Sequence, residues 1–398
     1  MKKIISIIAA VAIAACTIPS MSVFAAERTC EIKGVTWGFR LLPGHAALQS
    51  VSGNIKNLVM PETVDVGGMP YTLSSIDIRA LQNNTGIETF KFNSTCSDIG
   101  EYAFSGCKNL KKVILSDAVS NIGMRAFENT GLESVTLPTA TRNIGDYSFA
   151  NCTNMTSFTA GYGLTTMGDN ALYGCTSLKK VTLNRGLTKI GNRAIGYDNA
   201  TTKNTSISFT VARGSAGSKY AQDNGFSYKY NISDAGIAYI RDKKYTGKAM
   251  TPAVSLTDAG YALKLGTDYT VSYSRNTNPG NALITIKGIG DYEGTASTSF
   301  YIKPIVAQVK NVKATSKKGK LTVKWKKLAD ASGYRIQYAK KSNFAGKKTV
   351  TAPKTASKKQ IKKKLKSGKY FVRVCAYKRV GGRINYGPWS KTVKRKVK

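Results

Sequence analysis

Acidic residues are scarce in this chain of 398 residues, and histidine is almost absent. The sequence holds 22 Asp and Glu against 60 Lys and Arg, and its one histidine is His45. A Ser-His-Asp group could be built only around His45, which has no recognisable partner, and no C-x-x-C pair is present to bind zinc. The carboxylates are scattered in loops, so no pair suits glycoside hydrolysis. We therefore predict no catalytic residue, no metal and no cofactor, and a protein that is not an enzyme.

Long apolar runs are also rare. The one conspicuous run, Ile4 to Ala15, follows Lys2 and Lys3 and precedes small residues near Ala25. This order is typical of a secretory signal peptide, which we place at residues 1–26, and no later segment approaches the length of a membrane span. The Cys16 that ends the run also fits a lipoprotein cleavage site, so lipid attachment there is the alternative. We expect an exported chain that is secreted or held at the cell surface.

An isoleucine-glycine step recurs at a nearly fixed spacing. It occurs at Ile99-Gly100, Ile122-Gly123, Ile144-Gly145 and Ile190-Gly191, with Met167-Gly168 in the remaining place, so that the spacings are 23, 22, 23 and 23 residues. A period in the twenties is typical of a solenoid, in which each unit is too small to bury its own apolar face and stacks on its neighbours. The repeat therefore predicts an elongated stack with an extended surface.

Each repeat unit has the same internal pattern. After the Ile-Gly step, which we interpret as a turn, Ala103-Phe104 predicts a compact helical or irregular segment on the convex side. Leu110, Val113 and Leu115 then form L-x-x-V-x-L, which predicts a short strand. Cys107, Cys152 and Cys175 share one repeat position before the strand. We interpret them as structural residues whose small polar group satisfies backbone donors in a buried loop.

These units resemble the BspA-like class of leucine-rich repeats, which is found in bacterial surface proteins and some parasite surface proteins. The resemblance covers roughly residues 55–229, and with an amino-terminal cap it predicts a leucine-rich-repeat solenoid over residues 27–229. It implies adhesion to a protein or glycan ligand on host or neighbouring cells.

The strand face of this solenoid is the candidate ligand surface. The residues between the apolar strand positions should form two solvent-facing columns, which are mostly hydroxyl-bearing and mildly basic. The alternative is an ordinary solvated β face. The candidate ligand-binding residues are Thr89, Lys91, Lys112, Ile114, Ser134, Thr136, Ser157, Thr159, Lys180 and Thr182.

Two further segments follow the repeats. Residues 230–303 alternate between apolar and polar side chains and resemble a bacterial immunoglobulin-like β-sandwich. Residues 304–398 carry Trp325, Tyr370 and Trp389 in a pattern that resembles a fibronectin type III domain, with Tyr370 at a tyrosine corner one residue shorter than usual. That spacing predicts an outward Cys375, which leaves intermolecular pairing open. The expected fold class is a mixed multidomain protein: an α/β leucine-rich-repeat solenoid followed by two all-β sandwiches.

Positive charge is concentrated in the last segment. From residue 304 onward the chain has 30 Lys and Arg and a single acid, Asp330. An exported module of this charge should bind polyanions by counterion release, with teichoic acids or acidic host glycans as the expected class. The alternative is a lysine surface that only keeps the protein soluble. The candidate polyanion-binding residues are Lys358, Lys359, Lys362, Lys363, Lys364, Lys366, Lys369, Lys391, Lys394, Arg395, Lys396 and Lys398.

The combined features predict an exported, non-enzymatic binding protein of the Gram-positive type. Its solenoid would recognise a protein or glycan, and its Lys-rich last domain would bind anionic cell-wall polymers. Specific nucleic-acid recognition is not expected, because the lysines lack interleaved aromatic residues. The alternatives are a targeting scaffold associated with a carbohydrate- or wall-active enzyme, and a purely structural envelope component. The ligand, the oligomeric state and a disulfide between Cys30 and Cys96 stay open.

Overall fold

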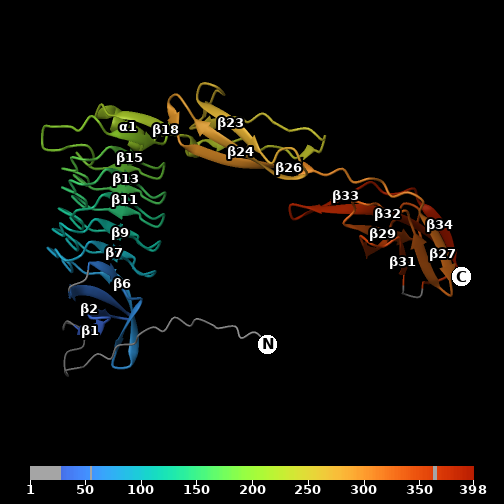
Figure 1. The fold of residues 1–398 in the computed structure, drawn as a ribbon, viewed down its shortest axis with the longest axis horizontal. Coiled ribbons are helices and arrows are strands. Elements are labelled where there is room, and N and C mark those ends of the chain that lie inside the picture. Colours follow the sequence, from blue (N-terminus) through green and yellow to red (C-terminus); the bar gives the residue numbers. More distant parts are fainter. Residues whose placement is uncertain (1–27, 54–55, 362–364) are drawn as a thin grey trace. The chain divides into compact units, whose positions relative to one another are not determined.

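The computed structural model describes residues 28–53, 56–361 and 365–398 (Figure 1). The predicted signal peptide 1–26, the alternative lipid site Cys16 and the run 362–364 lie outside these residues. The chain forms two compact units. The first holds the chain up to Ala235 with Asp258–Tyr261 and Gly288–Gly294, and the second holds Gly236–Thr257, Ala262–Lys287 and Thr295–Lys398.

The first unit begins with a small antiparallel cap. Strands β1 (Arg28–Ile32), β2 (Val35–Leu42) and β3 (His45–Ser52) follow one another, and β3 pairs in parallel with β6 (Met69–Ile76). Strand β5 (Thr63–Val66) pairs with β6. Trp37, Phe39 and Leu48 are buried and continuous with the core of the repeats. The cap therefore closes the amino-terminal end of the apolar core.

Two sets of parallel strands build the repeats. One set comprises β4 (Asn57–Val59), β7 (Thr89–Lys91), β9 (Lys112–Ile114), β11 (Ser134–Thr136), β13 (Ser157–Thr159), β15 (Lys180–Thr182), β17 (Ser208–Val211), β18 (Ser227–Asn231) and β25 (Tyr292–Glu293). Between β9 and β11 the Glu133 amide donates to the Lys111 carbonyl, 3.1 Å away, which continues the stack. The other set comprises β8 (Asp98–Ile99), β10 (Asn121–Ile122), β12 (Asn143–Ile144), β14 (Thr166–Met167) and β16 (Lys189–Ile190).

The structure corrects our interpretation, made from the sequence, of the Ile-Gly step as a simple turn. Its isoleucine ends a two-residue strand of the second set, and the glycine follows immediately. A Cβ on Gly100 would lie 2.7 Å from the Asp77 carbonyl carbon, and a Cβ on Gly145 would lie 2.6 Å from the Met124 nitrogen. Glycine recurs here because the backbones of successive coils approach too closely for a side chain.

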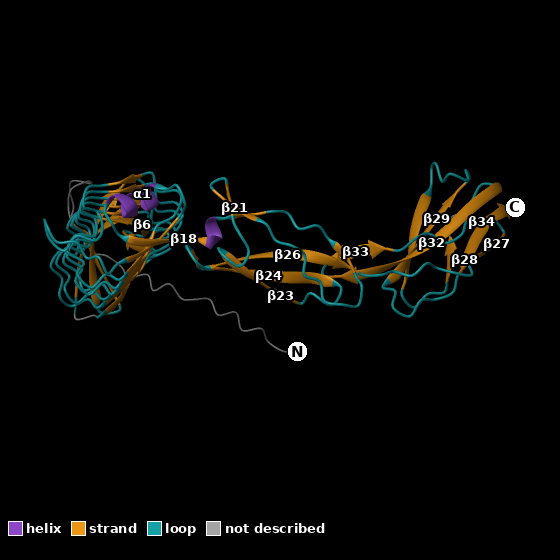
Figure 2. Ribbon diagram, turned by 90° about the horizontal axis from the view of Figure 1, so that it is seen from above, coloured by secondary structure: helices purple, strands orange, loops and turns teal. Residues whose placement is uncertain are grey.

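The convex side of the repeats consists of turns, so the expected α/β character of the solenoid is wrong. Among the described residues the one α-helix is α1 (Ala216–Asp223), which follows the repeats in the chain, and the repeat coils in Figure 2 are drawn as strands and loops. In the coil of Tyr102, that residue and Gly106 both have positive φ, 57° and 78°. The segments turn too tightly for a helix. Phe104, Phe127 and Phe149 stack beneath them with centroids 5.0 and 5.2 Å apart.

The repeat cysteines are buried and donate hydrogen bonds. The Cys107 thiol donates to the Leu81 carbonyl at 3.0 Å, and the Cys152 and Cys175 thiols donate to the Phe127 and Phe149 carbonyls at 3.2 Å. These thiols satisfy backbone acceptors, whereas the sequence interpretation had them satisfy donors. Cys96 has a free thiol, so the disulfide with Cys30 that the sequence left open is not formed.

After β18 the chain forms short strands around a modest core. Strands β19 (Gly236–Ile237), β21 (Leu256–Asp258) and β22 (Tyr261–Ala262) form one sheet. Strands β20 (Lys243–Lys244), β26 (Thr295–Lys303), β24 (Gly280–Gly288) and β23 (Tyr269–Ser274) form another. Ile284, Ile286 and Phe300 are buried. Buried residues alternate with exposed or half-buried ones along β24, as expected for a half-buried strand.

The last segment is a two-sheet sandwich. One sheet contains β27 (Lys313–Lys317), β28 (Lys320–Lys324) and β31 (Lys358–Ile361). The other contains β30 (Lys348–Pro353), β29 (Gly333–Ala339), β32 (Gly368–Val380) and β33 (Arg383–Tyr386), with β34 (Val393–Val397) also on β32. Trp325, Tyr334 and Val374 lie in the core between them. The Tyr370 hydroxyl donates to the Lys366 carbonyl at 3.1 Å, which is the bond of a tyrosine corner.

Cys375 lies on the outer face of its sheet, as expected, but it is fully buried there and not exposed. Its neighbours on β32 point into the sandwich core, whereas Cys375 belongs to the opposite face and lies directly across from Arg335 in the ladder. Arg335 and Arg373 both lie over the Trp389 ring, 4.8 and 4.4 Å from its centroid. This layer of arginine and tryptophan accounts for the burial of a residue on the outer face.

Candidate functional site

The ten predicted ligand residues lie in two columns on the strand face of the repeats. The register pairs Thr89 with Lys112, Ser134 with Ser157, and Ser157 with Lys180. The residues of the second column lie two positions further along each strand and are paired in the same way. Each residue is exposed or half-buried, while the residue between the two columns is buried or half-buried. The repeat geometry therefore brings all ten side chains to one face.

The columns extend beyond the predicted residues. Asn57 and Val59 precede them, and Ser208 and Thr210 follow in register. Val59 is 62% exposed and was missed because its coil has lost the repeat pattern. The far end of the second column is closed, because Thr210 is buried and its hydroxyl donates to the Glu293 carboxylate.

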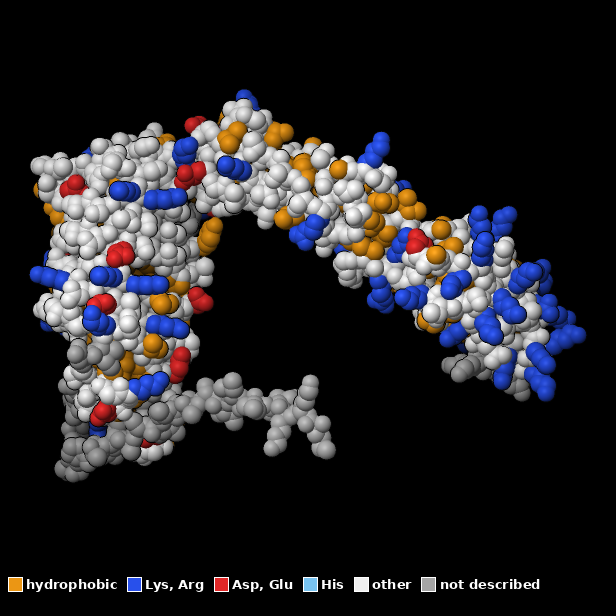
Figure 3. Space-filling view, in the orientation of Figure 1, with side chains coloured by type: hydrophobic (Ala, Val, Ile, Leu, Met, Phe, Trp, Pro, Cys, Tyr) orange, Lys and Arg blue, Asp and Glu red, His pale blue; other side chains and the backbone are white. Residues whose placement is uncertain are grey.

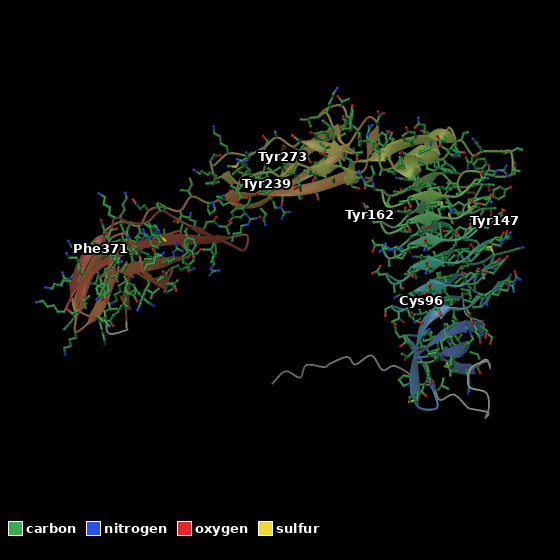
Figure 4. The ribbon with its side chains drawn as sticks, turned by 180° about the vertical axis from the view of Figure 1, so that it is seen from behind. Cys96, Tyr147, Tyr162, Tyr239, Tyr273 and Phe371 are labelled. Carbon is green, nitrogen blue, oxygen red and sulfur yellow. The ribbon has the colours of Figure 1, made fainter. Side chains whose placement is uncertain are left out.

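An exposed tyrosine adds an aromatic group to this part of the solenoid. Tyr162 follows β13 by three residues and is 63% exposed. Figure 4 shows it on the opposite side of the solenoid from Tyr147. Sequence reasoning missed Tyr162 because the neighbouring repeats carry no aromatic residue at its position. Hydroxyl columns with an exposed ring nearby can hydrogen-bond and stack on a sugar or a flat polar surface.

Opposite charges pair between neighbouring coils beside the columns. Lys56 and Glu88 form an ion pair of 2.8 Å. This pair raises the pKa of Lys56 and lowers the pKa of Glu88, each chiefly through their hydrogen bond. The charges that border the strand face at this end of the solenoid are therefore balanced locally.

The carboxyl-terminal end of the first unit is closed by a charged cluster. Asp258 is buried, accepts a hydrogen bond of 2.6 Å from Arg185 Nη2, and lies 3.2 Å from the Tyr292 hydroxyl. Arg213 Nε donates to that same hydroxyl at 3.0 Å, and its guanidinium lies 4.0 Å from the Tyr230 ring centroid. Burial raises the pKa of Tyr292 to about 12. The cluster fixes β25 against β18 and closes the solenoid sheet.

The predicted polyanion residues surround the last sandwich. Figure 3 shows lysine and arginine side chains crowding its visible surface. Lys358 and Lys359 lie on β31, Lys369 on β32, and Lys394, Arg395 and Lys396 on β34, while Lys366, Lys391 and Lys398 lie just outside strands. Lys359 is half-buried and the other residues named here are exposed. Lys362, Lys363 and Lys364 lie outside the described residues.

The structure brings some of these lysines together. Lys369 lies directly opposite Lys396 in the ladder of β32 and β34. Lys366 and Lys398 border one open depression together with Lys318, which was not predicted. Lys313 and Lys324 also escaped prediction, although they align with Lys358 across three strands. Their alignment depends on a register that the sequence does not reveal.

Little in the described chain suggests reaction chemistry. His45 is half-buried, and its Nδ1 lies 3.0 Å from the Pro43 carbonyl oxygen, a contact within its own turn. Within residues 28–53, 56–361 and 365–398, no three His, Cys, Asp or Glu side chains are grouped as a metal site would require. None of the helices there is sufficiently long and apolar to cross a membrane. The prominent features are surfaces.

Comparison with known proteins identifies the repeats. Residues 74–202 match the model of the BspA type leucine rich repeat region in six copies, so this stretch is similar to that family. No curated protein matches the chain. A leucine-rich repeat protein of T. pallidum is 19% identical, with a TM-score of 0.36, over 48% of this chain and 95% of its own. One from Bacteroides ovatus is 17% identical, with a TM-score of 0.32, over 51% and 67%. Domains FN1–FN3 of chicken CNTN1 are 15% identical, with a TM-score of 0.27, over 43% and 68%.

Proposed function

We propose that this chain is an exported, non-enzymatic binding protein of a Gram-positive cell surface. A signal peptide over residues 1–26 would direct its export. The last domain would hold anionic polymers of the envelope, and the repeat face would bind a protein or glycan on host or neighbouring cells. Residues 230–303 would act as an immunoglobulin-like spacer. The two-sheet core and the tyrosine corner around Tyr370 support a fibronectin type III assignment of residues 304–398.

The single observation that carries the proposal is the charge of the last sandwich. Its 30 basic residues face one acid, Asp330, which is already paired with Lys378. Lysines even lie opposite lysines, as in Lys369 and Lys396, where like charges destabilise the sheet. A surface that only needed solubility would gain more from mixed signs with a moderate net charge. Polyanion binding gives a reason for the accumulation.

The repeat face supports a second, separate binding role. Its two columns keep one register from β7 to β9, and again from β11 through β13 to β15. Such a face offers many weak polar contacts to an extended ligand. We propose a protein or a glycan as that ligand, with Tyr162 as an added stacking group.

Binding to purified Gram-positive cell walls tests the proposal. The full chain and a chain ending at Lys303 would be added to walls with and without teichoic acid over a salt series. We expect retention of the full chain that weakens as salt rises, and that disappears with either the last domain or the teichoic acid. Circular dichroism of the shorter chain would check that its remaining strands are folded.

Two results would count against this function. Equal retention of the chain ending at Lys303 would place wall binding in the repeats or the spacer. Retention of the full chain that resists high salt and yields only to wall digestion would show that electrostatic attraction does not hold the protein.

A further inference from the structure

The outer face of the sheet β27–β28–β31 carries lysines in rows that cross the strands. Lys313 lies opposite Lys324, and Lys324 lies opposite Lys358, so three ammonium groups from three strands form one row. Lys317 lies opposite Lys320 and begins a second row. All five side chains are exposed, whereas the alternate positions Ala314, Leu321, Val323 and Ile361 are buried. We call these two groups the lysine rows.

An uncharged row separates the lysine rows. Thr315 lies opposite Thr322, which lies opposite Gln360. Thr315 and Gln360 are exposed and Thr322 is half-buried. These side chains carry hydroxyl and amide groups that both donate and accept hydrogen bonds. The face therefore consists of a neutral hydrogen-bonding strip with positive charge on either side.

Like charges in directly opposed positions oppose sheet formation. The cross-strand Cβ separation of such pairs is about 4.5–5.5 Å, so each row repeats one charge at this interval. The solenoid shows that the same chain can place opposite charges side by side on neighbouring coils, because Lys56, just before β4, pairs with Glu88, just before β7. The repeated use of lysine on β27, β28 and β31 thus favours a role in binding.

We propose that this face binds a linear polymer of polyols joined by phosphodiesters, which lies along the neutral row and across the strands. Its phosphates would contact the lysine rows, and its hydroxyl groups would contact Thr315, Thr322 and Gln360. Flexible lysines are point charges that accommodate phosphates without fixed geometry. The exposed positions of this face hold no aromatic ring on which a nucleic-acid base could stack. The inference rests on the proposed binding of envelope polymers and assigns that binding to one face.

The first test measures binding of the full chain to poly(glycerol phosphate) over a salt series. The variant K313Q/K324Q/K358Q removes one lysine row, and K341Q/K347Q/K354Q removes the same charge from exposed positions elsewhere in the domain. We expect the row variant to lose at least about tenfold in affinity. The plot of log affinity against log salt should also become less steep, by about 2 in the magnitude of its slope, since each phosphate contact contributes about 0.7–0.9. We expect the control variant to change much less.

The results of this test distinguish a failure of the assignment to this face from a failure of the proposed binding of envelope polymers. Equal losses in both triple variants would show that charge acts diffusely and would overturn the assignment to this face, while wall binding by the last domain would stand. No binding by the unaltered chain would overturn both. Thermal unfolding of each variant would confirm that the sandwich is intact.

The second test addresses the neutral row. T322V keeps the charge and the approximate shape of the side chain but removes its hydroxyl. We expect weaker binding of poly(glycerol phosphate) and unchanged binding of inorganic polyphosphate, which has no polyol. An equal effect on both polymers, or an effect on neither, would overturn the role of this row in recognising the polyol.

Discussion

At the scale of single residues, the repeat glycines are required by the close approach of neighbouring coils. We predict that Gly145→Ala lowers the free energy of unfolding by about 1–3 kcal/mol, because its Cβ would lie 2.6 Å from the Met124 nitrogen and the stack cannot move one coil alone. Gly86→Ala is the matched control, since its Cβ would meet only Asn84 Oδ1, at 3.6 Å. Urea unfolding measures both. A control as destabilised as Gly145→Ala would contradict the explanation.

The buried thiols give a second prediction at this scale. Burial raises the pKa of Cys107 to about 12, above its ordinary value of 9.0. Folding favours the protonated thiol, so its contribution is complete below pH 9 and is lost as the pH rises from 9 toward 12. We expect the free energy of unfolding to fall less steeply over this range in Cys107→Ser, whose hydroxyl does not titrate there. Identical slopes in the two proteins would contradict it. Tyr292 titrates over the same pH range in the unaltered protein and in Cys107→Ser, so its effect on the free energy of unfolding cancels when the two are compared.

At the scale of elements, the short strands of the repeats could be predicted because their apolar residues alternate. Strand β9 falls within the L-x-x-V-x-L segment that predicted it. The second set of strands could not be predicted, because two residues such as Asn121–Ile122 are too few to show a period. The cover over Cys375 also has no local signal, since Arg335 lies on β29 and Trp389 in the loop between β33 and β34, far apart in the sequence. Register across β27, β28 and β31 likewise escaped prediction, and with it the lysine rows.

The closing strand β25 supports a prediction about the end of the solenoid. Asp258→Asn should lower the free energy of unfolding of the first unit by about 1.5–3 kcal/mol, because the buried carboxylate accepts charge-assisted hydrogen bonds. Asp223→Asn is the control, since Asp223 forms an exposed ion pair with Lys219 and should cost less than about 1 kcal/mol. Calorimetry of the three proteins compares them. Equal effects would show that the buried cluster does not stabilise the end.

At the scale of the whole molecule, charge is distributed unevenly along the chain. Self-repulsion among the 30 basic residues after position 304 should destabilise the last sandwich at low salt. We predict that raising salt increases the unfolding temperature of this sandwich more than that of the repeats, because salt screens exposed like charges. Differential scanning calorimetry would follow both transitions, and K313Q/K324Q/K358Q should reduce the shift. Equal shifts in both transitions would contradict this account.

The repeats also have a consequence for how this chain can change over evolutionary time. The coils that carry Phe104, Phe127 and Phe149 present nearly the same interface to one another, with a glycine after each short strand and a stacked phenyl ring. A duplication or deletion of one coil, 22 or 23 residues, would therefore join surfaces that already fit each other. The length of the strand face can be altered in steps of one coil, while the caps at both ends and the basic sandwich stay as they are.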